Sequence, residues 1–433
     1  NRLGQRGETM YGWNLEVYDR RIRAFGWETI LIDGHSFPEV LEAYKKAGQV
    51  ADKPTMIIAK TIKGKGVSMV ENKNGWHGKA LKPDDFEAAV QELGDIDLSV
   101  RGRLAPPRDL RPERPQPGPV DEPHYPADKP VPTRTAYGKA LKRLYPKFPA
   151  IVSLDGEVSN STMAEYFKEA YPQRFFEMYI AEQNMVGAAL GLAQRGQIPF
   201  VSTFAAFLTR AFDQIRMSRY SDPNLKFVGS HAGVSIGQDG PSQMGLEDLA
   251  MMRTVLDSVV LYPCDAYSAE RLVEEAARHQ GIVYIRTTRA GTPILYGPEE
   301  AFPIGGCKVL RQSAQDVATV VTAGITVFEA LKAYDELKEN GVNIRVIDLY
   351  SVKPVDEATL KDAARETRAV ITVEDHYAEG GLGEAVTSAL AATPTPVYSL
   401  AVRKKPQSGK PEELLDYENI SQRAIVARVK DLG

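Results

Sequence analysis

The sequence has little cysteine, no long apolar run and no large excess of either charge. Its 433 residues include two cysteines, Cys264 and Cys307, which excludes a disulfide framework and matches no metal-binding spacing. No apolar run approaches the ~20 residues that span a bilayer. Lys and Arg total 53 against 57 Asp and Glu, a net charge of -4, so nothing favours nucleic acid or an anionic membrane as a partner. We therefore expect a cytoplasmic protein that binds neither.

The chain is too long for one hydrophobic core, so several domains are expected. Residues 1–101 alternate strand and helix like the last part of an α/β domain. Residues 102–132 are predicted to be a semi-rigid linker, because ten of the 28 prolines fall between positions 106 and 132. Residues 133–300 and 301–433 are predicted to be two further α/β units. The first residue is Asn1 and no signal-like segment follows, so we expect the chain to begin inside a longer protein.

The stretch from Glu177 to Arg216 is predicted to organise the chain as strand, helix, strand, helix. Glu182 follows the first apolar run, where the carboxyl ends of parallel strands form the ligand crevice of open α/β sheets. Phe204 and Phe207 follow the second run and suit the wall of a pocket for a flat ring. Periodicity alone favours a plainer alternative, two ordinary βα units with a surface Glu and two core Phe.

Two basic or aromatic turns lie in the first 101 residues. The glycine-rich turn 61–66 places Lys63 after a strand, where a lysine and backbone N–H groups can reach a phosphate. A solvated basic loop explains this composition equally well. His77 lies between Trp76 and Gly78 in a loop, although a lone histidine is usually a packed or surface residue.

The loop 231–243 carries His231, Asp239 and Gln243 among glycines, without apolar periodicity. Such loops at strand ends are where α/β folds keep their chemistry, and here a functional role is favoured. Arg289 follows the strand near 283–285 and suits an anionic group. Residues 301–433 show no catalytic constellation, so their expected role is structural.

Motifs along the whole chain except the linker resemble those of transketolases, nearest the animal-like branch. They are NRLGQ (1–5), IIAKTIKGKG (57–66), WHGK (76–79), TRTAYGKAL (133–141), NST (160–162), YIAEQNMV (179–186), STFAAFLTRAFDQIR (202–216), SHAGVSIGQDGPSQM (230–244), YIRTTR (284–289) and VEDHYAEGGLGEAV (373–386). The resemblance implies three doubly wound α/β units: a thiamine-diphosphate-binding fold, incomplete in its first unit, and a C-terminal domain. It also implies a homodimer with active sites between subunits.

The resemblance implies that thiamine diphosphate and Mg²⁺ or Ca²⁺ serve as cofactors. Glu182 would bond a nitrogen of the pyrimidine ring, and its proton exchange would activate the thiazolium carbon. The other implied cofactor contacts are the stacking Phe207 with Phe204, the supporting Arg210, then Gln243, Lys63 and His77. Asn1 would bind the metal through its side chain and Leu3 through its carbonyl oxygen.

The implied substrates are sugar phosphates, between which a two-carbon ketol unit is transferred in the pentose phosphate pathway. His77, His231 and Asp239 would contact the sugar, with His77 and His231 counted as catalytic beside Glu182. Arg134, Ser161 and Arg289 would hold the phosphate, since two arginines and a hydroxyl suit a dianion.

One departure from the family pattern is large. The metal and diphosphate motif of the family opens with Gly-Asp-Gly, and this chain carries only its closing asparagine, Asn1. A separate N-terminal segment as partner is one expectation that follows. The alternatives are a non-catalytic transketolase-like chain and a related thiamine enzyme, such as deoxyxylulose-phosphate synthase or the β subunit of an α-keto acid dehydrogenase. His231 with Asp239 and the WHGK segment argue against the related enzyme.

Overall fold

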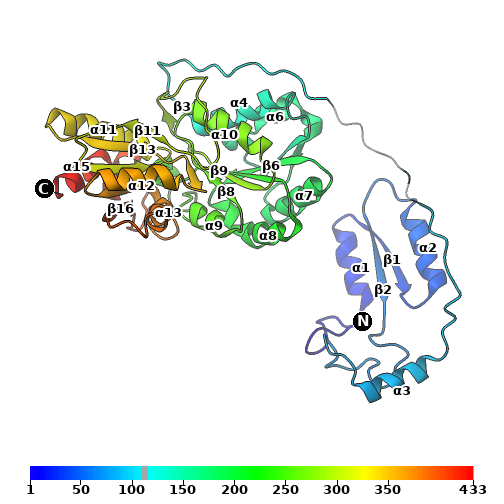
Figure 1. Cartoon of the computed structure of the whole chain (residues 1–433). Helices are drawn as coiled ribbons and strands as arrows, with labels where there is room; N and C mark the ends of the chain where they lie inside the picture. Colours follow the sequence, from blue (N-terminus) through cyan, green and yellow to red (C-terminus); the bar gives the residue numbers. More distant parts are fainter. Residues whose placement is uncertain (107, 109–115, 433) are drawn as a thin grey trace. The chain divides into compact units, whose positions relative to one another are not determined.

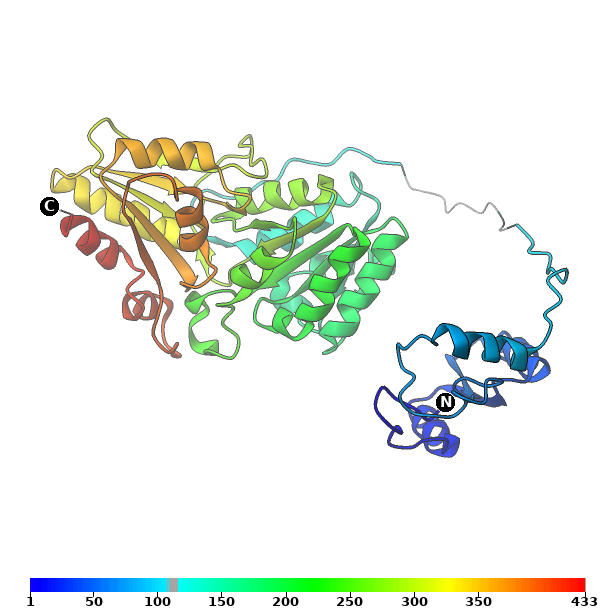
Figure 2. The same cartoon turned by 60° about the horizontal axis from the view of Figure 1, so that its bottom comes forward.

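The computed structural model describes residues 1–106, 108 and 116–432. The chain forms two compact units, Asn1–Leu110 and Arg111–Gly433, called unit 1 and unit 2 below. Figures 1 and 2 show that each consists of helices packed on parallel strands. The predicted α/β class is confirmed. Residues 107 and 109–115 of the predicted linker lie outside the described residues.

Unit 1 is a two-stranded parallel sheet flanked by helices (Figure 1). Its elements are α1 (Leu15–Ala24), β1 (Glu28–Asp33), α2 (Phe37–Ala47), β2 (Thr55–Lys60) and α3 (Pro83–Leu93). The strands pair in register from Glu28 opposite Thr55 to Asp33 opposite Lys60. Helix α2 begins after Ser36, whose hydroxyl accepts the Glu39 N–H, as capping requires.

Few side chains of unit 1 are buried. Among its described residues these are Leu3, Thr29, Ala43 and Ala89. Helix α2 exposes Phe37, Leu41 and Tyr44, and α3 exposes Phe86, Val90 and Leu93. Each set has the i, i+4, i+7 spacing of one helix face. The apolar faces that normally enter a core therefore lie open in unit 1.

The first sheet of unit 2 has seven strands in the order β14-β8-β9-β7-β6-β4-β5. The strands are β4 (Ile151–Asp155), β5 (Phe175–Glu177), β6 (Ile198–Phe204), β7 (Leu225–Ser230), β8 (Val259–Leu261), β9 (Ile282–Arg286) and β14 (Ser351–Lys353). All neighbours are parallel except β14, which runs antiparallel to β8. Strand β5 lies on one side of β4, and β6, the next strand in sequence, lies on the other side. The strand order therefore reverses direction at β4, and ligands of open α/β sheets bind at such a reversal.

Helices cover both faces of this sheet, as expected for parallel strands. They are α4 (Thr133–Leu144), α5 (Ser159–Thr162), α6 (Glu165–Ala170), α7 (Glu182–Gln194), α8 (Phe212–Ser218), α9 (Asp248–Thr254) and α10 (Ala266–Arg278), with 3₁₀ turns η1 (Pro172–Arg174), η2 (Phe207–Ala211), η3 (Arg219–Ser221) and η4 (Val234–Asp239). Helices α7, α8 and α9 share one hydrophobic core with the sheet, and α4, α6 and α10 share the other.

The second sheet of unit 2 has five strands in the order β11-β13-β12-β15-β16. The elements are β11 (Lys308–Arg311), β12 (Ala318–Thr322), α11 (Thr326–Glu339), β13 (Ile344–Asp348), α12 (Glu357–Glu366), β15 (Val370–Tyr377), α13 (Leu382–Ala389), β16 (Val397–Val402), α14 (Pro411–Tyr417) and α15 (Gln422–Lys430). Only β11 is antiparallel to its neighbour. Helices α11 and α15 pack in one core and α12 and α13 in another, on opposite faces (Figure 1).

The predicted linker 102–132 is folded at its C-terminal end, which differs from the expectation. Tyr125 is buried, its hydroxyl donates to Glu270 at 2.8 Å, and its N–H donates to the Tyr267 hydroxyl at 3.2 Å. Strand β3 (Val131–Pro132) pairs with β10 (Gly291–Thr292). Local proline content could not reveal these anchors, because their partners lie about 140 residues away in sequence.

Of the helices in the described part of the chain, none is long and apolar enough to cross a membrane.

Candidate active site

Glu182 lies at the first position of α7, beyond the carboxyl end of β5. Its side chain is buried, and its carboxylate forms an ion pair with Arg210 of η2, whose side chain is half exposed. The amide dipoles at a helix N-terminus stabilise a carboxylate placed there. The surface position that periodicity favoured is therefore wrong, and Glu182 is a buried acid with one cationic partner.

Three rings stack in a row beside this acid. Phe204, the last residue of β6, stacks on Phe207 with centroids 5.0 Å apart and on His231 with centroids 3.9 Å apart. The Arg210 guanidinium lies 4.3 Å from the Phe207 ring centroid. The rings thus form a flat aromatic wall that leads from Arg210 to His231. Phe204 and Phe207, which the sequence suggests as the wall of a pocket, stack directly on each other.

His231 follows β7 and adopts a left-handed backbone conformation with φ of 56°. Its Nδ1 lies 2.9 Å from the Ser230 hydroxyl. Burial, and then the charges of Arg134 and Arg289, lower the pKa of His231 to about 3. The imidazole is therefore neutral near pH 7, and it can hydrogen-bond a hydroxyl without carrying charge.

Arg134 and Arg289 make this end of the site positive. Arg134, in α4, donates through Nη1 to the Ser161 carbonyl at 2.6 Å, while its buried Nε lacks a partner among the described residues. Arg289, after β9, donates through Nη1 to the Ile236 carbonyl at 3.0 Å and pairs with Asp239 at 3.2 Å. Burial and the charge of Arg289 lower the pKa of Arg134. The positive charges of the two arginines repel each other, and an anion bound between them would relieve that repulsion.

Ser161 and Gln243 are two further residues predicted for the site. The Ser161 carbonyl accepts from Arg134, and the expected contact of its hydroxyl with a phosphate stays a prediction. Ser161 lies in the short helix α5 (Ser159–Thr162), and the Thr162 hydroxyl donates to Asp155 at 2.6 Å. Gln243 is half-buried, and its side-chain oxygen accepts from the Ser242 hydroxyl at 2.7 Å.

Asp155 is a further candidate site residue, one that no sequence pattern above indicates. It ends β4 beside the topological reversal, and it accepts the Val158 N–H at 2.7 Å. Burial raises the pKa of Asp155 to about 7. Its position before Gly156 at the end of an apolar strand is the signal that could have found it.

The other predicted residues lie in unit 1, and the structure does not relate them to the site of unit 2. Asn1 accepts the Leu3 N–H through Oδ1 at 2.9 Å. Lys63 is half-buried and His77 is exposed in the turn after Trp76. The segment of Asn1 and Leu3 lies against residues 72–74, because Arg2 donates to Asn72 Oδ1 at 2.9 Å.

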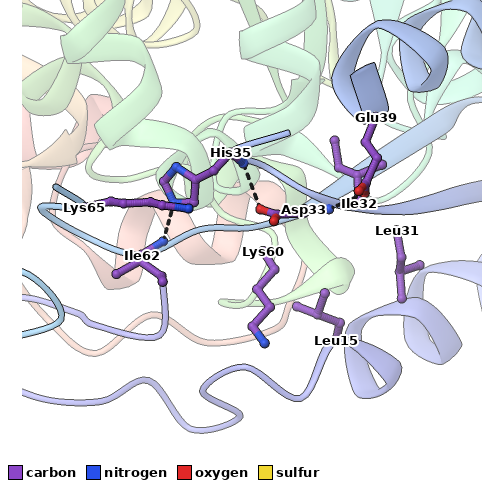
Figure 3. A pocket seen from close by; sticks show the side chains of 9 residues that line it. All are labelled: Leu15, Leu31, Ile32, Asp33, His35, Glu39, Lys60, Ile62 and Lys65. Carbon is purple, nitrogen blue, oxygen red and sulfur yellow. Dashed lines mark hydrogen bonds between the residues drawn. The ribbon is translucent and has the colours of Figure 1, made fainter. Parts of the chain in front are cut away.

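A hollow of about 480 Å³ opens at the carboxyl ends of β1 and β2 (Figure 3). Asp33, His35, Glu39, Lys60 and Lys65 line it together with apolar side chains. The Asp33 carboxylate accepts the His35 N–H at 2.9 Å, and His35 Nε2 accepts the Ile62 N–H at 2.7 Å. These groups are polar and lie where α/β sheets bind ligands. Lys63 and His77 are not among the lining residues.

Family models match most of the chain. The transketolase thiamine diphosphate binding domain matches residues 1–99, the pyrimidine binding domain residues 129–293, and the C-terminal domain residues 305–425.

Relatives and solved structures agree with these matches. The chain is 49% identical to transketolase-like protein 2 of Mus musculus and 47% identical to transketolase of Homo sapiens, covering 100% of this chain and 70% of each relative. A structure described as a split-gene transketolase, an inactive β4 tetramer, is 41% identical with a TM-score of 0.64 and covers 70% of this chain and 98% of its own. Transketolase of Campylobacter jejuni shares the fold, with a TM-score of 0.82 at 20% identity over 100% of this chain and 71% of its own. The chain belongs to the transketolase family.

Proposed function

We propose that the complete protein is a transketolase, which moves a two-carbon ketol unit from a ketose phosphate to an aldose phosphate in the pentose phosphate pathway. The observation that carries this proposal is one continuous site in unit 2. A buried acid, Glu182 with Arg210, lies at one end, an aromatic wall follows, and Arg134 and Arg289, which are suited to an anion, lie at the other. Such a site can hold a ring and a phosphorylated sugar side by side.

The residues of unit 2 fit the ring half of thiamine diphosphate. The Phe204 and Phe207 stack offers a flat apolar surface, and Glu182 is a buried group able to exchange a proton with a ring nitrogen. Arg210 orients that carboxylate, and Gln243 is a further polar contact. When bound, this cofactor supplies the electron sink that lets a carbon–carbon bond beside a ketose carbonyl break.

The residues of unit 1 supply only part of a diphosphate and metal site. Asn1 and Leu3 offer an amide oxygen and a carbonyl oxygen, which suit Mg²⁺ or Ca²⁺, and Lys63 and His77 are the proposed cofactor contacts. Among the described residues, however, no cluster of three or more His, Cys, Asp or Glu side chains could hold a metal ion. The metal therefore needs ligands in addition to those of unit 1, and no chemical step is assigned to it.

The sugar phosphate is proposed to bind with its phosphate between Arg134 and Arg289, near Ser161. The buried Arg134 Nε has no partner among the described residues, so it is a donor that a phosphate oxygen would satisfy. His231 is neutral near pH 7 and Asp239 is exposed beside Arg289, so both are suited to sugar hydroxyls. His77 is the proposed third sugar contact.

Two partners are proposed. Unit 2 exposes Phe176, Tyr179 and Ile180 just before Glu182, a surface suited to a second copy of the chain beside the site. The open apolar faces of α2 and α3 in unit 1 suit further α/β structure, whether from the same protein or from a separate N-terminal segment. The cytoplasmic location remains a prediction.

The test is turnover of xylulose 5-phosphate plus ribose 5-phosphate by the complete enzyme with Glu182→Ala. Loss of about 10²- to 10⁴-fold in kcat is expected, the range that one positioned acid contributes. The control is Asp213→Ala, which removes an exposed carboxylate paired with Arg216 in α8 and should leave turnover unchanged. Near-normal turnover by the Glu182 variant would rule out the assignment.

A non-catalytic transketolase-like chain is the second candidate. It is favoured by the incomplete metal site and by the similarity to a transketolase-like protein. The same site would then bind sugar phosphates without turning them over. Absence of turnover by the unaltered complete protein, supplied with thiamine diphosphate and Mg²⁺, would select this candidate.

A further inference from the structure

The loop that carries Asp239 and Gln243 packs into the second sheet of unit 2, although it follows a strand of the first. Val234, Ile236, Met244 and Leu246 are buried in one hydrophobic cluster with residues of β12, β15 and α14. The turn η4 therefore shares the core of the region 301–433. A structural role alone was expected for that region, and this packing links it to the candidate site.

Asp375 of β15 is the polar contact between the two regions. Its buried carboxylate accepts the Val234 N–H at 2.7 Å, with the Ser235 N–H at 3.5 Å. Gly233 adopts φ of 82°, and a Cβ there would lie 2.0 Å from Asp375 Oδ2. The carboxylate thus fills the space beside a backbone that only glycine fits, and it satisfies a buried donor at the start of η4.

Arg286 fixes the same junction from the other side. Its guanidinium is fully buried and donates to the Asp375 carbonyl and the Gly245 carbonyl, both at 2.8 Å. Gly245 in turn accepts the Gly233 N–H at 2.8 Å. Both ends of the loop from Gly233 to Gly245 are therefore tied to β15.

The loop also holds the phosphate-binding end of the site. The Ile236 carbonyl accepts from Arg289 Nη1 at 3.0 Å, and Asp239 pairs with the same guanidinium. Because Ile236 lies two residues beyond Val234, the orientation of Arg289 depends on how η4 is held. The contacts run without a gap from Asp375 through η4 to Arg289.

We propose that Asp375 is a positioning residue for sugar-phosphate binding: by ordering η4 it sets the orientation of Arg289 and Asp239. This inference rests on the proposed function, because it assigns the region 301–433 a part in the same site. Asp375 is assigned no contact with substrate or cofactor in this proposal, because its buried carboxylate accepts backbone N–H groups of η4.

Glu374 provides a matched control. It is the neighbouring buried carboxylate and also accepts two backbone N–H groups, those of Leu382 at 2.6 Å and Gly383 at 2.9 Å. Its partners lie at the start of α13 rather than in the loop. Loss of either carboxylate destabilises the same strand, but only loss of Asp375 should free η4.

The experiment compares the full chain with Asp375→Ala, Asp375→Asn and Glu374→Ala by hydrogen exchange of residues 231–246. Exchange in Asp375→Ala should rise about tenfold or more, since a buried amide loses its acceptor. Asp375→Asn keeps an acceptor oxygen and should recover most of the protection, while Glu374→Ala should leave the loop unchanged. Should Asp375→Ala not fold, Asp375→Asn against Glu374→Ala makes the comparison. Equal loop exchange in the Asp375 and Glu374 variants would overturn the proposal.

The second measurement is the dissociation constant for ribose 5-phosphate. We expect Asp375→Ala to weaken it about fivefold or more relative to Glu374→Ala, with Asp375→Asn close to the unaltered chain. A loosened loop with unchanged affinity would also overturn the proposal. Absence of binding by the unaltered chain would instead contradict the proposed function, and hydrogen exchange alone would then decide whether Asp375 orders η4.

Discussion

Unit 1 and unit 2 are built from the same kinds of elements but differ in how much they bury. Helix α10 of unit 2 buries ten residues and carries a capping box at Asp265, whereas α2 of unit 1 buries only Ala43. Both helices have an apolar face at helical spacing. The spacing of apolar residues thus predicts which face of a helix can be buried. It does not predict whether other parts of the chain pack against that face.

The two sheets show the same contrast. Strands β6 and β7 lie in the middle of seven strands and are almost entirely buried, while β1 and β2 form a pair with open edges. An isolated two-stranded sheet is at best marginally stable. The candidate site residues of unit 2 are therefore held by a well-packed sheet, whereas the predicted site residues of unit 1 are not.

The largest expected effect is in hydrogen exchange of the full chain. Amides of β6 and β7 should be protected about a thousandfold or more beyond those of β1 and β2, because core amides open only on global unfolding and poorly packed ones open locally. Mass spectrometry of peptides from both sheets measures this. Similar protection of the two sheets would remove the contrast between the units.

Matched leucine substitutions sharpen the comparison. Leu141→Ala in α4, where the side chain is 0% exposed, should lower the unfolding free energy by about 2–5 kcal/mol. Leu41→Ala in α2, where the side chain is 69% exposed, should change it by less than about 0.5 kcal/mol.

Urea unfolding of the full chain can assign these losses to the units. All three tryptophans, Trp13, Trp27 and Trp76, lie in unit 1, so their fluorescence follows unit 1, while far-UV circular dichroism mostly follows the larger unit 2. Leu141→Ala should move only the dichroism transition. A loss at Leu41 comparable to that at Leu141 would mean that α2 is already packed.

A smaller effect concerns the pH dependence of unit 2. The pKa of His231 is lowered to about 3 in the folded chain. In the unfolded chain this histidine is protonated near pH 6.5, whereas in the folded chain it is protonated only near pH 3. Stability should therefore fall as the pH drops through this window, and His231→Gln should flatten part of the fall. His376, with a pKa of about 4, contributes in the same direction. In an NMR titration, a His231 midpoint near pH 6.5 would contradict the burial of this side chain beside Arg134 and Arg289.

The sequence predicted much of the fold because strands and helices follow local patterns. The alternation of strand and helix predicted for residues 1–101 includes β1 and β2, and the strand predicted near 283–285 lies within β9. Glu182 was correctly placed near a strand end, but its burial and its pairing with Arg210 depend on the packing of η2 against α7.

Contacts between distant segments could not be predicted. Asp375 meets Val234 across 141 positions, and Tyr125 meets Glu270 across 145. No local pattern records such pairs, which is why the region 301–433 was assigned a purely structural role and residues 120–132 were assigned to a linker. The stack of Phe204 on His231 is non-local in the same way, since Phe204 ends β6 and His231 follows the neighbouring strand β7.

The proposed function assigns the ring and sugar contacts of a transketolase site to unit 2 and an incomplete set of diphosphate and metal contacts to unit 1. Calorimetry of the 433-residue chain with thiamine diphosphate and Mg²⁺ tests it most directly. We expect binding no tighter than about 1 mM, roughly 4 kcal/mol, because the diphosphate and metal lack most of their ligands. A dissociation constant in the micromolar range for this chain alone would contradict this assignment.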